Sequence, residues 1–226
     1  MFKIDCISTL IQHTHCVLCD VDTHNKIAIC QDCWKDLPWQ HNNCCPQCGL
    51  ASQGEVCGSC LSSPPFFDYT RALFIYSYPV DALLQAFKYQ HQLHLGQTFA
   101  NISLTQFHPS KIDCILPMPM HPTRLQERGF NQSVELAKGI AKHWQLPLAL
   151  SHCQRIKNTP PQASLPLKDR VRNIKGAFRC DDYFRGKRVA IVDDVMTSGA
   201  SLNELAKTLK QAGASEVTCW VIARTY

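Results

Sequence analysis

The segment that most constrains this chain covers residues 189–201 and reads Val-Ala-Ile-Val-Asp-Asp-Val-Met-Thr-Ser-Gly-Ala-Ser. Four apolar residues end in two adjacent carboxylates, and a short hydroxyl and glycine loop then leads into a helix-like run. Backbone N–H groups at a helix start favour anions, whereas paired carboxylates suit sugar hydroxyls or Mg²⁺. The segment therefore predicts a cradle for a phosphorylated ribose. Two aspartates that merely cap a turn and a helix are the alternative.

The rest of the chain beyond residue 65 alternates between strand and helix patterns. Expected strands cover residues 71–78, 112–116, 146–151, 177–179, 189–192 and 217–223. Expected helices cover residues 80–89, 96–104 and 131–143, and a last one follows residue 201 and stops at Gly213. Such alternation predicts an α/β fold with a mainly parallel sheet, and the 189–201 segment then lies at a strand's carboxyl end, where such sheets bind ligands.

Eight of the 14 cysteines form four pairs with CxxC spacing, which aims both thiolates of a pair at one tetrahedral Zn²⁺. The four pairs are Cys16/Cys19, Cys30/Cys33, Cys45/Cys48 and Cys57/Cys60. Two zinc ions are predicted, paired in sequence order, with interleaved pairing as the alternative. Disulfides are the other alternative, but they need an oxidising compartment for which the sequence carries no signal.

The cysteine-rich segment is too short to build its own core, so its zinc ions are predicted to be structural. It ends near a Ser-Ser-Pro-Pro junction at residues 62–65, which suits a short linker. We therefore expect a zinc-binding domain over residues 1–62 and an α/β domain over residues 66–226. Five cysteines outside the pattern are interpreted as isolated small hydrophobic residues, namely Cys6, Cys114, Cys153, Cys180 and Cys219.

Charge is unevenly distributed along the 226 residues, whose net charge is +5. Residues 1–64 carry −3 and residues 65–226 carry +8, with eight basic and three acidic side chains in residues 168–188. Such a patch suits the phosphates of a small ligand or of nucleic acid, and an ordinary solvated surface is the alternative. No apolar run reaches the ~20 residues that span a bilayer, and the start is no convincing signal peptide, so a cytoplasmic location is expected.

Two resemblances to known protein families indicate a function for this chain. Residues 189–201 resemble the 5-phosphoribosyl-1-pyrophosphate (PRPP) motif of type I phosphoribosyltransferases. Together with the CxxC pairs, four further blocks make the whole chain similar to the bacterial ComF family (ComFC or GntX-like proteins). Those blocks are Pro-Met-Pro at 117–119, Arg-Leu-Gln-Glu-Arg-Gly-Phe-Asn-Gln at 124–132, Pro-Gln-Ala-Ser-Leu at 161–165 and Arg-Val-Arg-Asn-Ile-Lys-Gly-Ala-Phe at 170–178.

The resemblance implies a double zinc ribbon followed by a phosphoribosyltransferase-like domain, with a competence role in DNA uptake and natural transformation. It implies PRPP, or a related phosphoribosyl ligand, accompanied by Mg²⁺. The implied PRPP-binding residues are Asp193, Asp194, Val195, Met196, Thr197, Ser198, Gly199, Ala200 and Ser201. The loop at residues 117–119 is the implied pyrophosphate site.

Other roles stay open at this point. Arg124 and Arg128 are candidates for pyrophosphate contact, with exposed loop arginines as the alternative. No catalytic residue or base pocket is identified. Phe130, Asn131 and Gln132 are candidates for such a pocket, but helix-start packing explains Phe130 and capping explains Asn131 equally well. Lys88 is expected to be solvated. Single-stranded DNA and DNA-uptake or recombination proteins are the expected partners. An active phosphoribosyltransferase of nucleotide metabolism and a purely structural adaptor are the alternative functions.

Overall fold

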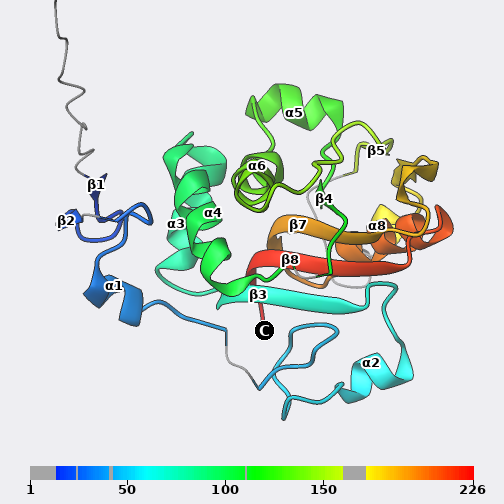
Figure 1. Ribbon diagram of the computed structural model, residues 1–226, viewed down its shortest axis with the longest axis horizontal. Helices are drawn as coiled ribbons and strands as arrows, with labels where there is room; N and C mark the ends of the chain where they lie inside the picture. Colours follow the sequence, from blue (N-terminus) through cyan, green and yellow to red (C-terminus); the bar gives the residue numbers. More distant parts are fainter. Residues whose placement is uncertain (1–13, 24, 41–42, 110, 160–171) are drawn as a thin grey trace, which may run out of the picture.

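A four-stranded parallel sheet, in the order β3-β8-β7-β4, forms the centre of the molecule (Figure 1). The structure is a computed structural model that describes residues 14–23, 25–40, 43–109, 111–159 and 172–226. The strands are β3 (Tyr69–Ile75), β4 (Cys114–Pro117), β7 (Arg188–Met196) and β8 (Glu216–Arg224). The sheet confirms the predicted mainly parallel α/β fold.

The two central strands carry continuous apolar runs, at residues 189–192 on β7 and 219–223 on β8, because both faces of the sheet are covered. On β7, Val189 and Ile191 enter one hydrophobic core, whereas Ala190 and Val192 enter the other. This burial fixes the register of β7, because a slip of one residue would exchange the two faces.

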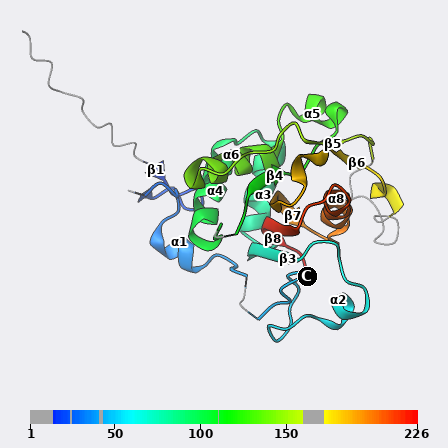
Figure 2. The same ribbon diagram turned by 45° about the vertical axis from the view of Figure 1, so that its right-hand side comes forward.

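Helices cover one face and a helix with a small hairpin-like sheet covers the other (Figure 2). The first face carries α3 (Val80–Tyr89), α4 (His94–Gln106) and α6 (Gln132–Trp144). The second carries α8 (Ala200–Gln211), the antiparallel strands β5 (Cys153–Arg155) and β6 (Phe178–Cys180), and the 3-10 turn η2 (Asp182–Phe184).

The cysteine-rich part consists of β1 (Thr14–His15), β2 (Asp22–Thr23), α1 (Gln31–Lys35) and α2 (Gly58–Ser62). Its first half contacts α4, where the Asn101 amide donates to the Lys26 carbonyl. Its second half lies along β3, where Thr70 N donates to Pro46 O at 2.9 Å. Figure 1 places α1 and α2 at separate positions beside β3.

Three expectations are corrected. Residues 146–151 form no strand: Leu148 makes one bridge to Ile115, and the proline at 147 has no N–H to extend it. Helix α5 (Pro122–Arg128) was not predicted, although its proline lies at the start and Gly129, with φ 81°, ends it. Strand β7 continues past residue 192 because Asp193 to Met196 still pair with β8.

Along the part of the chain that the structure describes, every helix is too short or too polar to cross a lipid bilayer.

Candidate functional site

The junction between β7 and α8 forms the centre of the candidate site. Strand β7 ends at Met196, three loop residues follow, and α8 begins at Ala200. Gly199 takes the left-handed φ of 76°, and an added Cβ there would lie 2.8 Å from Met196 Cε. Only glycine fits this tight turn, which brings the N-terminus of the 12-residue α8 up to the end of the strand. The junction therefore presents helix N–H groups and carboxylates to the same space.

Asp193 lies partly buried among hydrogen-bond donors. Its Oδ1 accepts from Ser133 Oγ and from the backbone N–H of Asp194, both at 2.9 Å. Burial, followed by the charge of Asp194, raises the pKa of Asp193 to about 7. The carboxyl group therefore changes its charge near neutral pH and is poised to respond to a cationic or hydroxyl ligand.

Asp194 is held by an ion pair that sequence reasoning did not predict. Its Oδ2 lies 2.9 Å from Lys88 Nζ, and the side chains are only 6% and 18% exposed. Burial acts to lower the pKa of Lys88, but the Asp194 charge outweighs it and raises that pKa above its usual value. The expectation of a solvated Lys88 is therefore wrong, and the only signal for it was its place at the end of a helix whose apolar face is buried.

A cavity of about 420 Å³ opens over this junction. All nine residues predicted to bind PRPP line it, as do Arg124, Arg128 and Ser133. Met118 and Pro119 of the predicted pyrophosphate loop at residues 117–119 also line the cavity, as does Met120 after them, whereas Pro117 is the last residue of β4. The structure thus brings every predicted phosphoribosyl-contacting segment to one site.

Helix α5 carries the two predicted arginines on the rim of this cavity. Arg124 Nη2 donates to Thr159 O at 2.9 Å, and Arg128 Nη1 donates to Gln132 Oε1 at 2.7 Å. The guanidinium of Arg128 also lies 5.3 Å from the ring centroid of Tyr89. Both arginines are partly buried on a helix and do not belong to an exposed loop.

A second cavity of about 620 Å³ adjoins the first and shares four lining residues with it. The shared residues are Lys88, Tyr89, Arg124 and Arg128. The Tyr89 side chain is 68% exposed, and His91 lines the same space. The second cavity therefore offers an aromatic ring and cations directly beside the candidate ribose site.

Arg155 is a site residue that the sequence gave no reason to select. It follows Cys153 on β5, lines the first cavity, and its Nη2 donates to Thr159 Oγ1 at 2.5 Å. Its buried Nε has no hydrogen-bond partner, and burial together with the charge of Arg124 lowers its pKa. Two guanidinium groups of like charge next to an unpartnered donor favour an anionic ligand at this wall.

Arg224 was also not predicted as a site residue, and it holds the start of the loop after β7 through hydrogen bonds to backbone carbonyls. It closes β8, is 4% exposed and donates through Nη1 to Met196 O at 3.0 Å and to Thr197 O. Its Nε donates to Cys48 O at 2.9 Å. A single arginine directly after the apolar run at residues 219–223 was the signal that could have identified it.

The eight paired cysteines form two clusters, each with its four Sγ atoms within 4.8 Å of one another. Cys19 and Cys30 Sγ lie 3.7 Å apart, as do Cys48 and Cys57 Sγ. Tetrahedral zinc with Zn–S bonds of about 2.3 Å requires sulfurs about 3.8 Å apart, so these sets fit the metal. The clusters follow sequence order, and their complete Cys₄ sets are those of structural zinc.

Backbone donors favour the thiolates that zinc needs. Burial acts to raise the pKa of Cys16, but backbone N–H groups outweigh it and lower that pKa to about 6. The same balance lowers the pKa of Cys45 to about 7. One thiol of each cluster is therefore already disposed to ionise.

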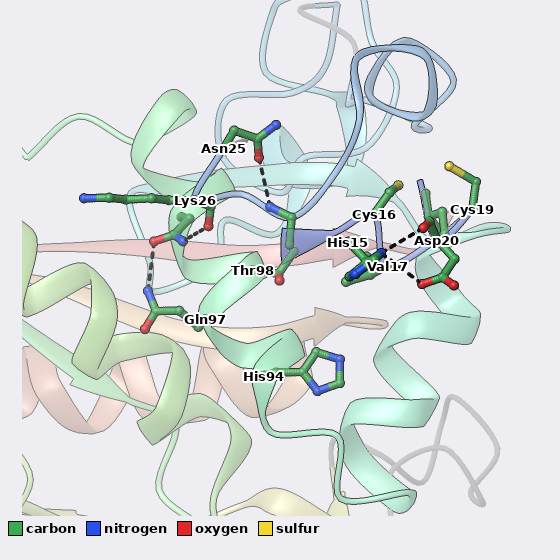
Figure 3. Close-up of a pocket in the computed structure, with 13 residues that line it drawn as sticks. His15, Cys16, Val17, Cys19, Asp20, Asn25, Lys26, His94, Gln97 and Thr98 are labelled. Atoms are coloured by element: carbon green, nitrogen blue, oxygen red, sulfur yellow. Dashed lines mark hydrogen bonds and ion pairs between the residues drawn. The ribbon is translucent and has the colours of Figure 1, made fainter. Parts of the chain in front are cut away.

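A larger cavity, of about 1140 Å³, lies elsewhere, between the first cysteine cluster and α4 (Figure 3). His15, Asn25, Lys26, His94 and Gln97 lie around it. None of the predicted PRPP-binding residues lines it, so cavity size alone would have misplaced the phosphoribosyl site.

The predicted basic patch at residues 168–188 is only partly described. Lys168 and Arg170 lie outside the described residues, whereas Arg188 Nη2 pairs with Asp113 Oδ1 at 2.7 Å. Lys187 Nζ lies 3.0 Å from the centroid of the Tyr183 ring. Arg188 and Lys187 of this patch therefore contact other side chains of the protein.

Comparison with known proteins agrees with this architecture. Residues 7–61 match the Double zinc ribbon domain, and residues 131–225 match the Phosphoribosyl transferase domain. The chain is 32% identical to competence protein F of Haemophilus influenzae over 225 residues, covering 92% of this chain and 96% of that one. It is 32% identical to DNA utilization protein YhgH of Salmonella typhimurium over 209 residues, covering 88% and 91%. It is 22% identical to competence protein ComFC of Bacillus subtilis over 233 residues, covering 93% and 95%.

Proposed function

The chain belongs to the family of competence protein F and DNA utilization protein YhgH, and from this premise we propose that it acts in DNA uptake and natural transformation, in the cytoplasm, as a protein that binds PRPP or a related phosphoribosyl ligand. The proposal depends on one observation: Asp193, Asp194 and the N-terminus of α8 line one cavity. The names of its relatives support the DNA-handling role, and the cavity supports the ligand.

The ligand's 5′-phosphate would lie on residues 197–201, which line the cavity and could supply the backbone N–H groups at the start of α8 and three side-chain hydroxyls. The ribose diol would donate hydrogen bonds to the carboxylates of Asp193 and Asp194. Mg²⁺ that accompanies PRPP would take carboxylate oxygens of the same two residues, with water and pyrophosphate as its other ligands.

Arg124, Arg128 and Arg155 would hold the pyrophosphate. All three line the cavity, and the unpartnered Nε of Arg155 is a donor without a present acceptor. Three guanidinium groups offer the planar, paired donors that match phosphate oxygens. The three arginines would share the contact with the pyrophosphate.

An active phosphoribosyltransferase is the second candidate function, and the adjoining cavity favours it. An acceptor seated beside Tyr89 and His91 would lie next to the ribose site. The reaction would be displacement of pyrophosphate at ribose C1, and catalysis would consist of positioning and charge stabilisation. Pyrophosphate release, screened over purine and pyrimidine bases, separates turnover from binding alone.

Calorimetric titration with PRPP, with and without Mg²⁺, tests the ligand. We expect Asp193→Ala combined with Asp194→Ala to weaken PRPP binding on the order of 100-fold, since two charged hydrogen-bond acceptors are lost. Asp113→Ala is the matched control, because this carboxylate precedes β4 at the opposite end of the strands. A wild-type protein that binds no PRPP, or a double variant that binds as wild type does, would refute the ligand.

The partner is tested separately with single-stranded DNA. Binding should weaken steeply with salt if phosphate contacts carry it. Charge reversal at Lys168, Arg170 and Arg172 should lower both the affinity and the salt dependence. An unchanged affinity would remove this patch from the DNA-binding role and leave the phosphoribosyl ligand untouched.

A further inference from the structure

Two cysteines outside the zinc clusters lie in direct contact. Cys153 on β5 and Cys180 on β6 place their Sγ atoms 2.7 Å apart. The sequence predicted both as isolated hydrophobic residues, since 26 residues separate them. The antiparallel pairing of β5 with β6 brings them together.

The strand register gives these cysteines the geometry of a crosslink. Cys153 and Cys180 are direct partners across the two strands. Asp181 N donates to His152 O, and Ile156 N donates to Ala177 O, so hydrogen-bonded pairs alternate with a non-bonded pair at the cysteines. Residues in a non-bonded pair have Cα atoms about 4.5 Å apart, which lies within the range that a disulfide spans.

A metal does not explain this pair. Among the residues that the structure describes, groups of three or more metal-ligating side chains occur only at the two Cys₄ clusters. Neither cluster includes Cys153 or Cys180. Two thiols without a third ligand are suited to thiol chemistry rather than to zinc.

We propose that Cys153 and Cys180 are a redox-active dithiol, oxidised to an intrachain disulfide by a low-molecular-weight disulfide such as oxidised glutathione. The Cys180 thiolate attacks the oxidant, forming a mixed disulfide and releasing one glutathione thiolate, which takes up a proton. The Cys153 thiolate then attacks Cys180 Sγ, forming the intrachain bond and releasing the second glutathione. Two protein thiols are oxidised and one glutathione disulfide is reduced to two thiols.

The two thiols differ in their exposure to solvent, and this difference sets the order in which they react. Cys180 is partly exposed, whereas Cys153 is 4% exposed. The hydrogen bond with Cys180, followed by burial, raises the pKa of Cys153 well above its usual value. Cys180 is therefore the attacking thiol and Cys153 the resolving thiol.

The crosslink would lie beside the wall of the phosphoribosyl cavity that Arg155 lines. Arg155 follows Cys153 on the same strand and contacts Thr159, which also binds Arg124. The sulfurs need to approach by less than about 1 Å to reach a bond length of about 2.0 Å. Oxidation should therefore fix this wall of the cavity without reshaping it.

Peptide mapping of the full zinc-loaded chain after treatment with oxidised glutathione tests the proposal. We expect a crosslinked peptide pair containing Cys153 and Cys180, with zinc retained. Oxidised protein should also melt on the order of 5–10 °C higher than reduced protein, because the crosslink restricts the unfolded chain. A wild-type map with glutathione or crosslinks only on other cysteines would overturn the proposal, whatever the variants do.

Single variants distinguish the two roles. Cys153→Ser should accumulate glutathione on Cys180, because no resolving thiol remains, whereas Cys180→Ser should take up none at Cys153. Cys44→Ser removes a partly exposed thiol outside the pair and should leave the crosslink intact. Equal labelling of the Cys153→Ser and Cys180→Ser variants would contradict the assigned order, and loss of the crosslink in Cys44→Ser would contradict the pair.

Discussion

Replacing Asp193 by asparagine should make the protein more stable above neutral pH while damaging its ligand site. Burial and the neighbouring Asp194 raise the pKa of Asp193 from 3.8 to about 7. Between these values the folded state keeps a proton that the unfolded state has released. The stability that this proton provides is therefore lost as pH rises from about 4 through about 7.

The size of the expected stability change follows from the pKa shift of Asp193. Each pKa unit corresponds to about 1.4 kcal/mol, so the full penalty of ionised Asp193 is about 4 kcal/mol above pH 7. About 2 kcal/mol of it develops between pH 5 and pH 7. Asparagine removes the penalty and retains an oxygen that accepts from Ser133 Oγ and from Asp194 N, the two bonds that Asp193 Oδ1 makes.

Urea unfolding followed by tryptophan fluorescence at pH 5, 6, 7 and 8 measures the effect. Wild type and Asp193→Asn are compared at each pH, so that protonation of the zinc ligands cancels between them. Asp113→Asn is the control, because the side-chain hydrogen bond from Arg188 lowers the pKa of Asp113 to about 2. That control should lower stability by the same amount at every pH in this range.

The reasoning fails if the stability difference between wild type and Asp193→Asn is constant from pH 5 to pH 8. It also fails if the variant loses stability relative to wild type as pH rises. Either result would mean that Asp193 is already ionised at pH 5, and that Lys88 stabilises both carboxylates rather than mainly its ion-pair partner, Asp194.

Three further changes have distinct expected outcomes. Lys88→Met should lower the free energy of unfolding by about 3–5 kcal/mol, because it strands the buried charge of Asp194, and added Asp194→Asn should recover most of that loss in the same urea assay. Gly199→Ala should cost about 1–2 kcal/mol from its positive φ and weaken PRPP binding in calorimetry. Arg224→Met should lower the free energy of unfolding by about 3 kcal/mol in urea, since it leaves several buried carbonyls without a donor, and hydrogen exchange should increase at Met196.

The sequence predicted those parts of the fold that local patterns determine. The helix at residues 80–89 has the bounds of α3, because its apolar spacing and its burial coincide. The two cysteine clusters followed from spacing, since CxxC fixes two ligands within one turn. Helix α5 was overlooked although its proline and Gly129 are ordinary start and stop signals, because the prolines before it favoured a loop.

The site residues that belong to one continuous segment could be predicted from the sequence. Those that come from separate helices and strands could not. All of residues 193–201 line one cavity as expected. Lys88, Ser133 and Arg155 join them from three other elements, and nothing in their local sequence encodes that meeting. Cys153 and Cys180 illustrate the same limit, since their contact depends on the pairing of two short strands.

Arg224 connects the second cysteine cluster with the loop that follows β7. Its guanidinium joins Cys48 O, within the second zinc cluster, to Met196 O and Thr197 O at the end of β7. A buried guanidinium with carbonyl acceptors on two sides is held rigidly, because moving either side would leave a charged donor unpaired. We therefore expect the folded shape of the second zinc cluster to help fix the loop after β7, and with it the backbone of the proposed phosphoribosyl cradle.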